Sequence, residues 1–270
     1  MKPKGFKVEL KIILAKIPGV LFLYKKIKKL LGVDNYISLN GFTFNHRGML
    51  TRQNSDFKTD PEFARSFERG VKQYEIFNKK PIAEKQRPYW ERYIAMWAAS
   101  HAKHLEGDYV ECGVATGMTA MSVVDYIDFK NMPDRKFYLF DTFRGLDKRF
   151  STNQEYARYK DKYSDSYEFI RDSFRQFPNV IIVRGAIPET LSRVDIKSIS
   201  YLHIDMNCVM PEIGAVNYFW PKLETAAMVI LDDYGWLKHK DQKRAMDEFA
   251  LENKVKILTL PTGQGLMIKA

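Results

Sequence analysis

Between residue 108 and the C-terminus, short apolar runs alternate with stretches in which apolar residues recur at helical spacing. The apolar runs predict strands over 108–114, 136–143, 180–186, 200–207 and 227–234. The helical spacing predicts helices over 117–128, 164–177, 211–223 and 238–251. Strands that alternate with helices indicate an α/β fold, in which a mostly parallel sheet is covered by helices on both faces.

The chain ends in two further apolar runs separated by only a short connection. The pattern predicts strands over 255–260 and 265–270, joined by the Pro-Thr-Gly-Gln-Gly run at 261–265. This connection has no room for a crossover helix, so the last two strands must be antiparallel. A seven-stranded, mostly parallel sheet with a C-terminal antiparallel hairpin resembles the Rossmann-like fold of class I methyltransferases. A dehydrogenase does not normally end in this way.

The first hundred residues follow other patterns, and charge separates their beginning from the rest of the chain. Residues 1–30 hold nine lysines and one acid, whereas the remaining 240 residues carry 34 Lys and Arg against 32 Asp and Glu. We therefore divide the chain into a basic amphipathic N-terminal arm (1–35), a region of loops and cap helices (36–104) and an α/β domain (105–270). In the middle region, helices are predicted over 61–78 and 88–105, the second one crowded with aromatic residues.

The basic arm has two interpretations. Its lysines alternate with apolar residues over 6–31, and Pro18-Gly19 divides the pattern into two short helices. Residues 1–31 would suit peripheral contact with an anionic membrane. The interpretation that we favour is packing on the body or on a neighbouring subunit, as in a homodimer, because basic amphipathic patterns are common. Since the excess charge lies on the arm and not across a folded face, we expect no nucleic-acid partner.

Two cysteines and one short apolar segment indicate the compartment. Cys112 and Cys208 each end a predicted buried strand and are expected to be reduced thiols. The apolar segment 17–24 is too short to span a bilayer, and no small-residue cleavage site follows it. We therefore expect a cytoplasmic enzyme, associated with a membrane only if the arm binds one.

The first strand of the α/β domain ends in a glycine turn that begins with an acid. Its order is Glu111-x-Gly113-x-Ala115-x-Gly117, and a helix follows. A strand, a turn and a helix N-terminus together present backbone N–H groups to a ligand. The Glu111 carboxylate would attract the ammonium and sulfonium groups of S-adenosylmethionine and repel a pyrophosphate. The turn is therefore predicted to bind S-adenosylmethionine, and it lacks the three-glycine spacing of an NAD(P)-binding oxidoreductase.

Two later strand ends complete this predicted cofactor site. Asp141 ends the second strand, 30 residues after Glu111, where a carboxylate can accept hydrogen bonds from ribose hydroxyls. The alternative for Asp141 is a helix or turn cap. Thr142 follows it, and Gly185 and Ala186 end the third strand, where the adenine edge is expected.

Three carboxylates lie at the ends of the next two strands: Asp205 on one, and Asp232 and Asp233 on the other. Burying them together would be costly without a cation, and Mg²⁺ or Mn²⁺ with oxygen ligands would remove that cost. The alternative is that Asp232 or Asp233 caps a helix, which suits one Asp better than three. His203 and His239 lie nearby and are candidate catalytic bases, although a lone His is more often a packing residue.

Several of these motifs together resemble the macrocin O-methyltransferase (TylF-type) family. The segments that carry the resemblance are 111–117 (ECGVATG), 140–146 (FDTFRGL), 202–205 (LHID), 232–234 (DDY), 242–249 (QKRAMDEF) and 261–265 (PTGQG). The resemblance covers roughly residues 85–270. It implies a Mg²⁺-requiring transfer of methyl from S-adenosylmethionine to a sugar hydroxyl. Asp205, Asp232 and Asp233 would be the metal ligands, and Asp205 would also be the general base.

One position departs from the family's usual Asp-x-Asp pattern, because Asn207 stands where the second Asp would be. The missing charge puts metal affinity, substrate choice and activity itself in question. Two alternatives therefore stay open: a metal-independent N- or O-methyltransferase, and a catalytically silent cofactor-binding scaffold. The acceptor would be a small molecule or a glycan that the sequence does not identify. The segment 144–166 is a candidate lid over both ligands.

Overall fold

The computed structural model describes residues 44–270, which belong to two compact units, one ending at Ser55 and the other covering Asp56–Ala270. In the first unit, β1 (Phe44–His46) and β2 (Met49–Thr51) pair as an antiparallel hairpin. Arg47 and Gly48 connect them with φ of 46° and 86°, as a tight two-residue hairpin turn requires. The predictions for the arm at 1–35, including its helices and membrane contact, lie outside the described residues.

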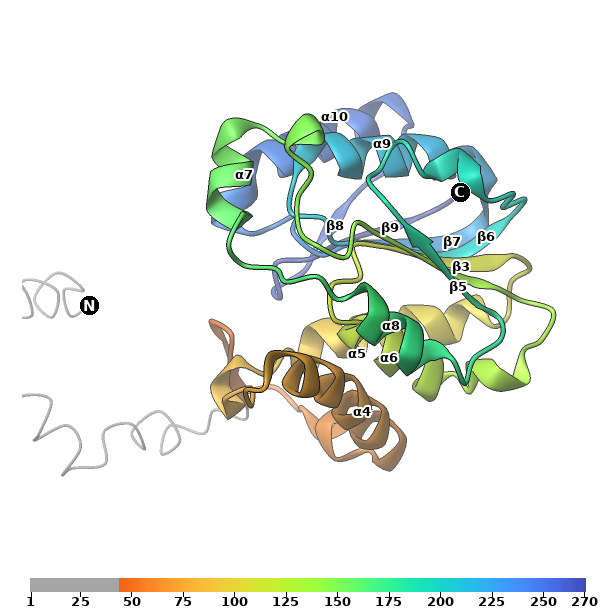
Figure 1. The fold of residues 1–270 in the computed structure, drawn as a ribbon. Coiled ribbons are helices and arrows are strands. Elements are labelled where there is room, and N and C mark those ends of the chain that lie inside the picture. Colours follow the sequence, from red (N-terminus) through yellow and green to blue (C-terminus); the bar gives the residue numbers. More distant parts are fainter. Residues whose placement is uncertain (1–43) are drawn as a thin grey trace, which may run out of the picture. The chain divides into compact units, whose positions relative to one another are not determined.

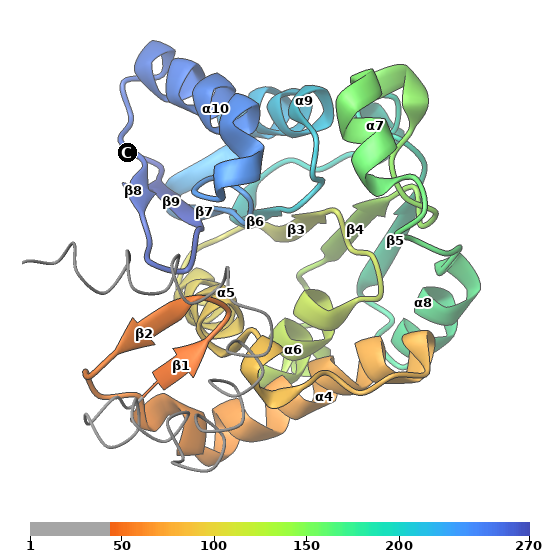
Figure 2. The ribbon, with the colours of Figure 1, turned by 90° about the vertical axis from the view of Figure 1, so that its left-hand side faces the viewer.

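The second unit is built on a seven-stranded sheet in the order β5-β4-β3-β6-β7-β9-β8 (Figures 1 and 2, with all seven strands labelled in Figure 2). The strands are β3 (Asp108–Cys112), β4 (Phe137–Asp141), β5 (Val180–Arg184), β6 (Ile199–Ile204), β7 (Leu223–Leu231), β8 (Leu258–Thr259) and β9 (Gly265–Ile268). Strands β3 to β7 pair in parallel, and β9 pairs antiparallel with both β7 and β8. The predicted mostly parallel sheet with its antiparallel C-terminal hairpin is confirmed. β7 begins before the predicted residue 227, since its first part pairs with β6 across a register shift.

Helices cover both faces of this sheet (Figures 1 and 2). On one side lie α5 (Tyr89–Ala102), α6 (Met118–Tyr126) and α8 (Tyr167–Phe174), with α4 (Pro61–Asn78) packed on α5 and α6. On the other side lie α7 (Asn153–Tyr159), α9 (Val209–Phe219) and α10 (Lys240–Glu252). Short 3-10 helices span Asp56–Thr59, Glu84–Gln86, Phe129–Asn131, Lys148–Phe150, Leu191–Arg193, Trp220–Lys222 and Leu237–His239. Within residues 44–270, no helix is both long and apolar enough to cross a membrane.

The central strands are buried because their sequences are nearly continuous apolar runs. All six residues of β6 are buried, and β3 and β4 each bury four of five. Leu202, Val229 and Phe219 belong to the core that joins the sheet to α9 and α10. Burying one such side chain contributes about 1.5–3 kcal/mol. Polar residues on these strands, such as His203, are consequently carried into the interior.

Helices α4 and α6 pack closely through a small residue and an ionic cluster. A Cβ at Gly70 of α4 would lie 2.0 Å from Ser122 Oγ of α6, so only glycine allows this approach. The Asp125 carboxylate accepts a hydrogen bond from Arg65 Nε (2.9 Å) and also pairs with Arg69. These contacts place α4 in one compact unit with the sheet. The domain boundary drawn at residues 104 and 105 stays a prediction.

Candidate active site

The glycine turn after β3 lies directly against the end of β6. Gly113 has φ of 91°, and a Cβ at this position would lie 1.8 Å from the backbone oxygen of Asp205. Only glycine permits so close a backbone approach. Gly117 precedes α6 with φ of 76°, and Ala115 also adopts the left-handed region, with φ of 49°. The strand ends that carry the predicted cofactor turn and the first predicted metal ligand are therefore in contact.

Asp141, at the end of β4, holds this turn from the other side. One of its carboxylate oxygens accepts hydrogen bonds from the backbone N–H groups of Val114 (2.6 Å) and Ala115 (2.8 Å). The other oxygen accepts from the Phe143 N–H (2.6 Å). The structure thus shows Asp141 as a turn cap, while ribose binding stays a prediction. Both roles are compatible, because an ionised carboxylate offers about four lone-pair sites.

A cavity lies beside the turn, along the C-terminal ends of β3, β4, β5 and β6. Six residues predicted to bind the cofactor line it: Gly113, Ala115, Asp141, Thr142, Gly185 and Ala186. Asp205 lines it as well, so the predicted donor site and a predicted metal ligand share one cavity. Gly117 and Glu111 were also predicted to bind the cofactor, and neither is among the lining residues.

Glu111 faces the layer of α5 and α6 instead. Strand residues alternate between the two faces of a sheet, and Tyr109, two positions earlier, donates a hydrogen bond to the Ala99 carbonyl of α5 (3.2 Å). Glu111 is buried, and its Oε2 has no hydrogen-bond partner among the described residues. Burial raises the pKa of Glu111 to about 8, although the positive charge of Arg92 opposes this shift. Glu111 therefore lies beneath the turn and not at the cavity wall.

Asp205, Asp232 and Asp233 come together at the ends of β6 and β7. Each offers one carboxylate oxygen, and these oxygens lie within 4.8 Å of one another. Burial and repulsion from the other carboxylates raise the pKa of Asp205 well above its usual value and that of Asp233 to about 7. Oxygen ligands whose charges repel one another suit a hard divalent cation. The donor set thus fits the predicted Mg²⁺ or Mn²⁺.

Asp232 differs from its two neighbours because donors and positive charge surround it. Gln264 Nε2 donates a hydrogen bond to Asp232 Oδ1 (2.8 Å). Two further groups lie close to the same oxygen, His203 Nε2 at 3.6 Å and Arg92 Nη2 at 3.8 Å. Burial alone would raise the pKa of Asp232, but these three groups hold it below its usual value. Asp232 is therefore ionised, and its Oδ1 is already in contact with Gln264, His203 and Arg92.

Neither candidate histidine lines the cavity. His203 is fully buried on β6, and burial lowers its pKa, so it is neutral at pH 7. His239 is buried beside α10, where Nδ1 contacts Gln242 and Nε2 contacts the Tyr159 hydroxyl (2.8 Å). His239 Nε2 also lies 3.6 Å from Asp233. The two histidines thus stand behind the carboxylate cluster, one against Asp232 and the other against Asp233.

The structure adds functional residues that the sequence analysis missed. Arg92 is the one residue of α5 that lines the cavity, among several aromatic neighbours that do not. Glu212 is buried behind the cluster, where it accepts hydrogen bonds from Met206 N–H (3.3 Å) and Gln242 Nε2 (3.0 Å). Gln264 lies in the connection between the last two strands. No sequence signal gave these residues a role, although Gln264 lies in the 261–265 segment that carries the family resemblance, because each contacts the site only through burial next to a distant strand end.

The segment 144–166 contains α7, a helix that the sequence pattern did not predict. Thr152 and Glu155 form a capping box at its start. The same Glu155 accepts a hydrogen bond from Val209 N–H at the start of α9 (2.9 Å). Arg158 donates to the Lys238 carbonyl (2.7 Å), and Tyr159 contacts His239. These contacts dock α7 on the side of α9 and α10.

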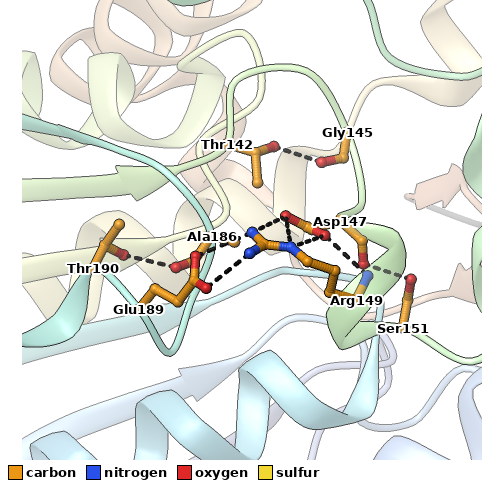
Figure 3. A network of polar contacts seen from close by, with 8 residues as sticks. All are labelled: Thr142, Gly145, Asp147, Arg149, Ser151, Ala186, Glu189 and Thr190. Atoms are coloured by element: carbon orange, nitrogen blue, oxygen red, sulfur yellow. Dashed lines mark hydrogen bonds and ion pairs between the residues drawn. The ribbon is translucent and has the colours of Figure 1, made fainter.

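An ionic bridge joins the loops that follow β4 and β5 (Figure 3). The Arg149 guanidinium donates to both oxygens of Asp147 and to both oxygens of Glu189, at 2.7–3.3 Å. Around it, Ser151 Oγ donates to the Asp147 carbonyl (2.7 Å), and Thr190 Oγ1 donates to the Ala186 carbonyl (3.2 Å). Asp147 and Ala186 both line the cavity. Arg149 thus connects the two walls between which the adenosine part of a donor is predicted to lie.

A comparison with known families identifies the chain. The model of the macrocin O-methyltransferase (TylF) family matches residues 93–259, which include the glycine turn, Asp141 and all three carboxylates. The chain belongs to this family. It is therefore an S-adenosylmethionine-dependent O-methyltransferase. No curated protein matches the chain.

Solved structures of two other methyltransferases share the fold. The O-methyltransferase NovP matches with a TM-score of 0.60 and 18% identity, over 93% of this chain and 98% of that chain. The calicheamicin methyltransferase CalS11 matches with a TM-score of 0.53 and 15% identity, over 80% of this chain and 97% of that chain. Identities this low show a common fold, and the Rossmann-like methyltransferase architecture predicted from the sequence is confirmed.

Proposed function

We propose that this member of the TylF family transfers a methyl group from S-adenosylmethionine to a sugar hydroxyl, with the help of Mg²⁺ or Mn²⁺. The acceptor would be a glycan or a glycosylated metabolite, as the resemblance to macrocin O-methyltransferases implies. The observation that carries the proposal is the group of Asp205, Asp232 and Asp233, with Asp205 lining the cavity of the glycine turn. A donor site and a set of oxygen ligands next to each other suit metal-assisted O-methylation.

The donor would lie along the strand ends. Its adenine would contact Gly185 and Ala186, and Asp141 with Thr142 would face the ribose. The remainder would pass the glycine turn at Gly113, which lines the same cavity. These assignments are supported by the shared cavity lining of all five residues.

The three carboxylates would hold the divalent ion. When bound, this ion would lower the pKa of the acceptor hydroxyl. The protein fixes one of the ligands in advance, because Gln264, His203 and Arg92 surround Asp232. His239 Nε2 and Gln242 Nε2 lie 3.6 Å and 3.5 Å from the Asp233 carboxylate, which favours a positioning role for both histidines.

Asp205 is the proposed general base. It lines the cavity, and its Oδ1 accepts a hydrogen bond from Asn207 Nδ2 (3.3 Å). Asp205 would accept the hydroxyl proton as the acceptor oxygen bonds to the methyl carbon. The bond between methyl and sulfur breaks, and S-adenosylhomocysteine leaves with the electron pair. Asn207 Nδ2 also contacts the Tyr163 hydroxyl (3.3 Å), so the amide that replaces the family's second Asp connects the base to the 144–166 segment.

Removal of the metal tests the proposed function. The full-length chain is stripped with EDTA, and S-adenosylhomocysteine formation is measured with a panel of glycosides and nucleotide sugars. We expect turnover to be lost in EDTA and restored by Mg²⁺ or Mn²⁺. Asp232→Asn should abolish turnover and calorimetric Mg²⁺ binding, whereas Asp195→Asn, at a largely exposed acid paired with Lys197, should change neither. Full turnover in EDTA would support a metal-independent methyltransferase, and donor binding without turnover on any acceptor would support a silent scaffold.

Three further expectations stay predictions: a homodimer, membrane contact through residues 1–31, and a cytoplasmic location.

A further inference from the structure

Two cations line the cavity within the part of the chain that the structure describes, Arg92 and Lys162. Lys162 is exposed, and its ammonium lies 4.5 Å from the centre of the Tyr159 ring of α7. Arg92 belongs to α5 and is buried, with 7% of its surface exposed. Of the two cations that line the cavity, Arg92 is therefore the one that is shielded from solvent.

The Arg92 guanidinium has N–H groups that make no hydrogen bond within the described residues. Its Nη2 lies 3.8 Å from Asp232 Oδ1, which is longer than a hydrogen bond. Its Nε has no hydrogen-bond partner among residues 44–270. Buried polar groups are nearly always hydrogen-bonded, and a guanidinium binds a carboxylate through two parallel N–H bonds. The Arg92 side chain lines the cavity, and neither its Nε nor its Nη2 makes a hydrogen bond within residues 44–270, so its guanidinium is suited to an anionic ligand.

The order of the strands directs one end of the donor toward Arg92. This step rests on the proposed function, which puts adenine at Gly185 and ribose at Asp141. Because the strands follow the order β5-β4-β3-β6-β7, the remainder of the donor extends past Gly113 toward β6 and β7. Helix α5 contacts both of these strands, and Arg92 is the residue of α5 that reaches the cavity.

We propose that Arg92 binds the α-carboxylate of the methyl donor and so positions the donor's methyl group. S-adenosylmethionine carries this carboxylate together with an ammonium and a sulfonium group. The carboxylates of Asp141 and Asp205, which line the cavity, repel it, and Arg92 attracts it. Held at its adenosine end by Asp141 and at its amino-acid end by Arg92, the donor presents its methyl group in one place.

The test compares two ligands that share an adenosine and differ in the amino-acid part. S-adenosylhomocysteine has the carboxylate, whereas 5′-methylthioadenosine has no amino-acid part. Both are titrated calorimetrically into the full-length chain, in chelator and without acceptor. Arg92→Gln should weaken S-adenosylhomocysteine binding about 10–100-fold, which is the loss of a charge-assisted contact. Binding of 5′-methylthioadenosine should not change.

Two further variants test whether the loss is specific to the guanidinium of Arg92. Arg92→Lys retains the charge without the fork of donors, so its affinity for S-adenosylhomocysteine should fall between those of Arg92→Gln and the unaltered chain. Arg244→Gln, at an exposed cation of α10 that does not line the cavity, should bind both ligands as the unaltered chain does. Equal weakening of both ligands in Arg92→Gln would show that Arg92 only maintains the cavity, and the proposal would be wrong. Unchanged S-adenosylhomocysteine binding would also overturn it.

A measurement on the unaltered chain covers the case in which Arg92→Gln does not fold. S-adenosylmethionine should bind more tightly than its decarboxylated form, and equal affinities would overturn the role of Arg92. None of these titrations needs a metal or an acceptor, so they can succeed even if metal-dependent O-methylation fails. If neither nucleoside binds the unaltered chain, the donor site is wrong, and the role of Arg92 with it.

Discussion

The backbone oxygen of Asp205 lies where a side chain on Gly113 would stand, 1.8 Å from the position of its Cβ. Through this contact, the turn at the end of β3 and the strand end of β6 support each other. One strand end carries the predicted donor turn and the other carries the proposed base. The distance between donor and base is thus set by backbone packing, which is less adaptable than contact between side chains.

Gly113→Ala should consequently disrupt the site. The added Cβ would collide with backbone, and a left-handed conformation costs a non-glycine residue about 1–2 kcal/mol in addition. We expect lower thermal stability and loss of S-adenosylhomocysteine binding, measured by calorimetry. Gly214→Ala is the matched control, because a Cβ there meets Pro188 at an ordinary 3.6 Å, within helix α9. This control should be neutral or stabilising by up to about 1 kcal/mol, and equal effects of the two variants would contradict the packing argument.

Glu111 should make the fold less stable as pH rises. Burial raises its pKa in the folded state from 4.5 to about 8. Between these values the folded chain binds more protons than the unfolded chain, so the free energy of unfolding falls with rising pH, by at most about 1.4 kcal/mol per pH unit. Glu111→Gln should make this slope smaller in urea unfolding between pH 5 and 8, and the part due to the raised pKa values of Asp205 and Asp233 should remain. Glu248→Gln, at an exposed acid of α10, should retain the full slope. An unchanged slope in Glu111→Gln would show that Glu111 is ionised in the folded state.

Asp125 should stabilise the packing of α4 on α6, and its effect on stability should depend on pH in the opposite sense to that of Glu111. Although its burial opposes the shift, hydrogen bonds from Arg65 and Arg69 lower the pKa of Asp125 below 3.8. Its stabilising effect is present above that value and is lost as pH falls through the lowered pKa. Asp125→Asn should therefore cost about 1–3 kcal/mol at pH 7, and this difference should shrink as the pH is lowered toward 2.

The control for Asp125 is the exposed pair of Asp241 and Arg244 on α10, at 3.0 Å. Exposed ion pairs contribute about 0–1 kcal/mol, so Asp241→Asn should cost little at any pH. A cost of Asp125→Asn that stays the same from pH 7 to pH 2 would show that charge is not its cause.

Arg149 should slow the release of the donor product. Its bridge between Asp147 and Glu189 joins the two loops that flank the predicted adenosine site (Figure 3). Arg149→Ala should increase the dissociation rate of S-adenosylhomocysteine several-fold in stopped-flow measurements. Since the bridge is exposed, high salt screens it, and 1 M NaCl should bring the unaltered chain close to the variant. Arg175→Ala, which removes an exposed pair with Asp172 outside the cavity lining, should leave the rate unchanged.

Two features of the structure, helix α7 and the orientation of Glu111, could not be predicted from the sequence. α7 has only seven residues, too few for a periodic pattern, and it is docked by Glu155, Arg158 and Tyr159 on partners at 209, 238 and 239. Glu111 has the right position in the motif, but strand alternation turns it toward α5 and α6. Contacts between residues this far apart in the sequence cannot be read from spacing.

The sequence by itself determined the order of strands and helices along residues 61–270 except for α7, together with the antiparallel end of the sheet and the strand ends at which the chemistry-bearing residues lie. Local periodicity specifies elements, and the carboxyl ends of parallel strands necessarily meet at one edge. Only the tertiary structure decided that Arg92, Gln264 and Glu212 join this edge, and that Glu111 and both histidines stand behind it. The physical reason is that burial and charge pairing depend on which helix face packs against which strand, and long-range packing of the whole chain settles that.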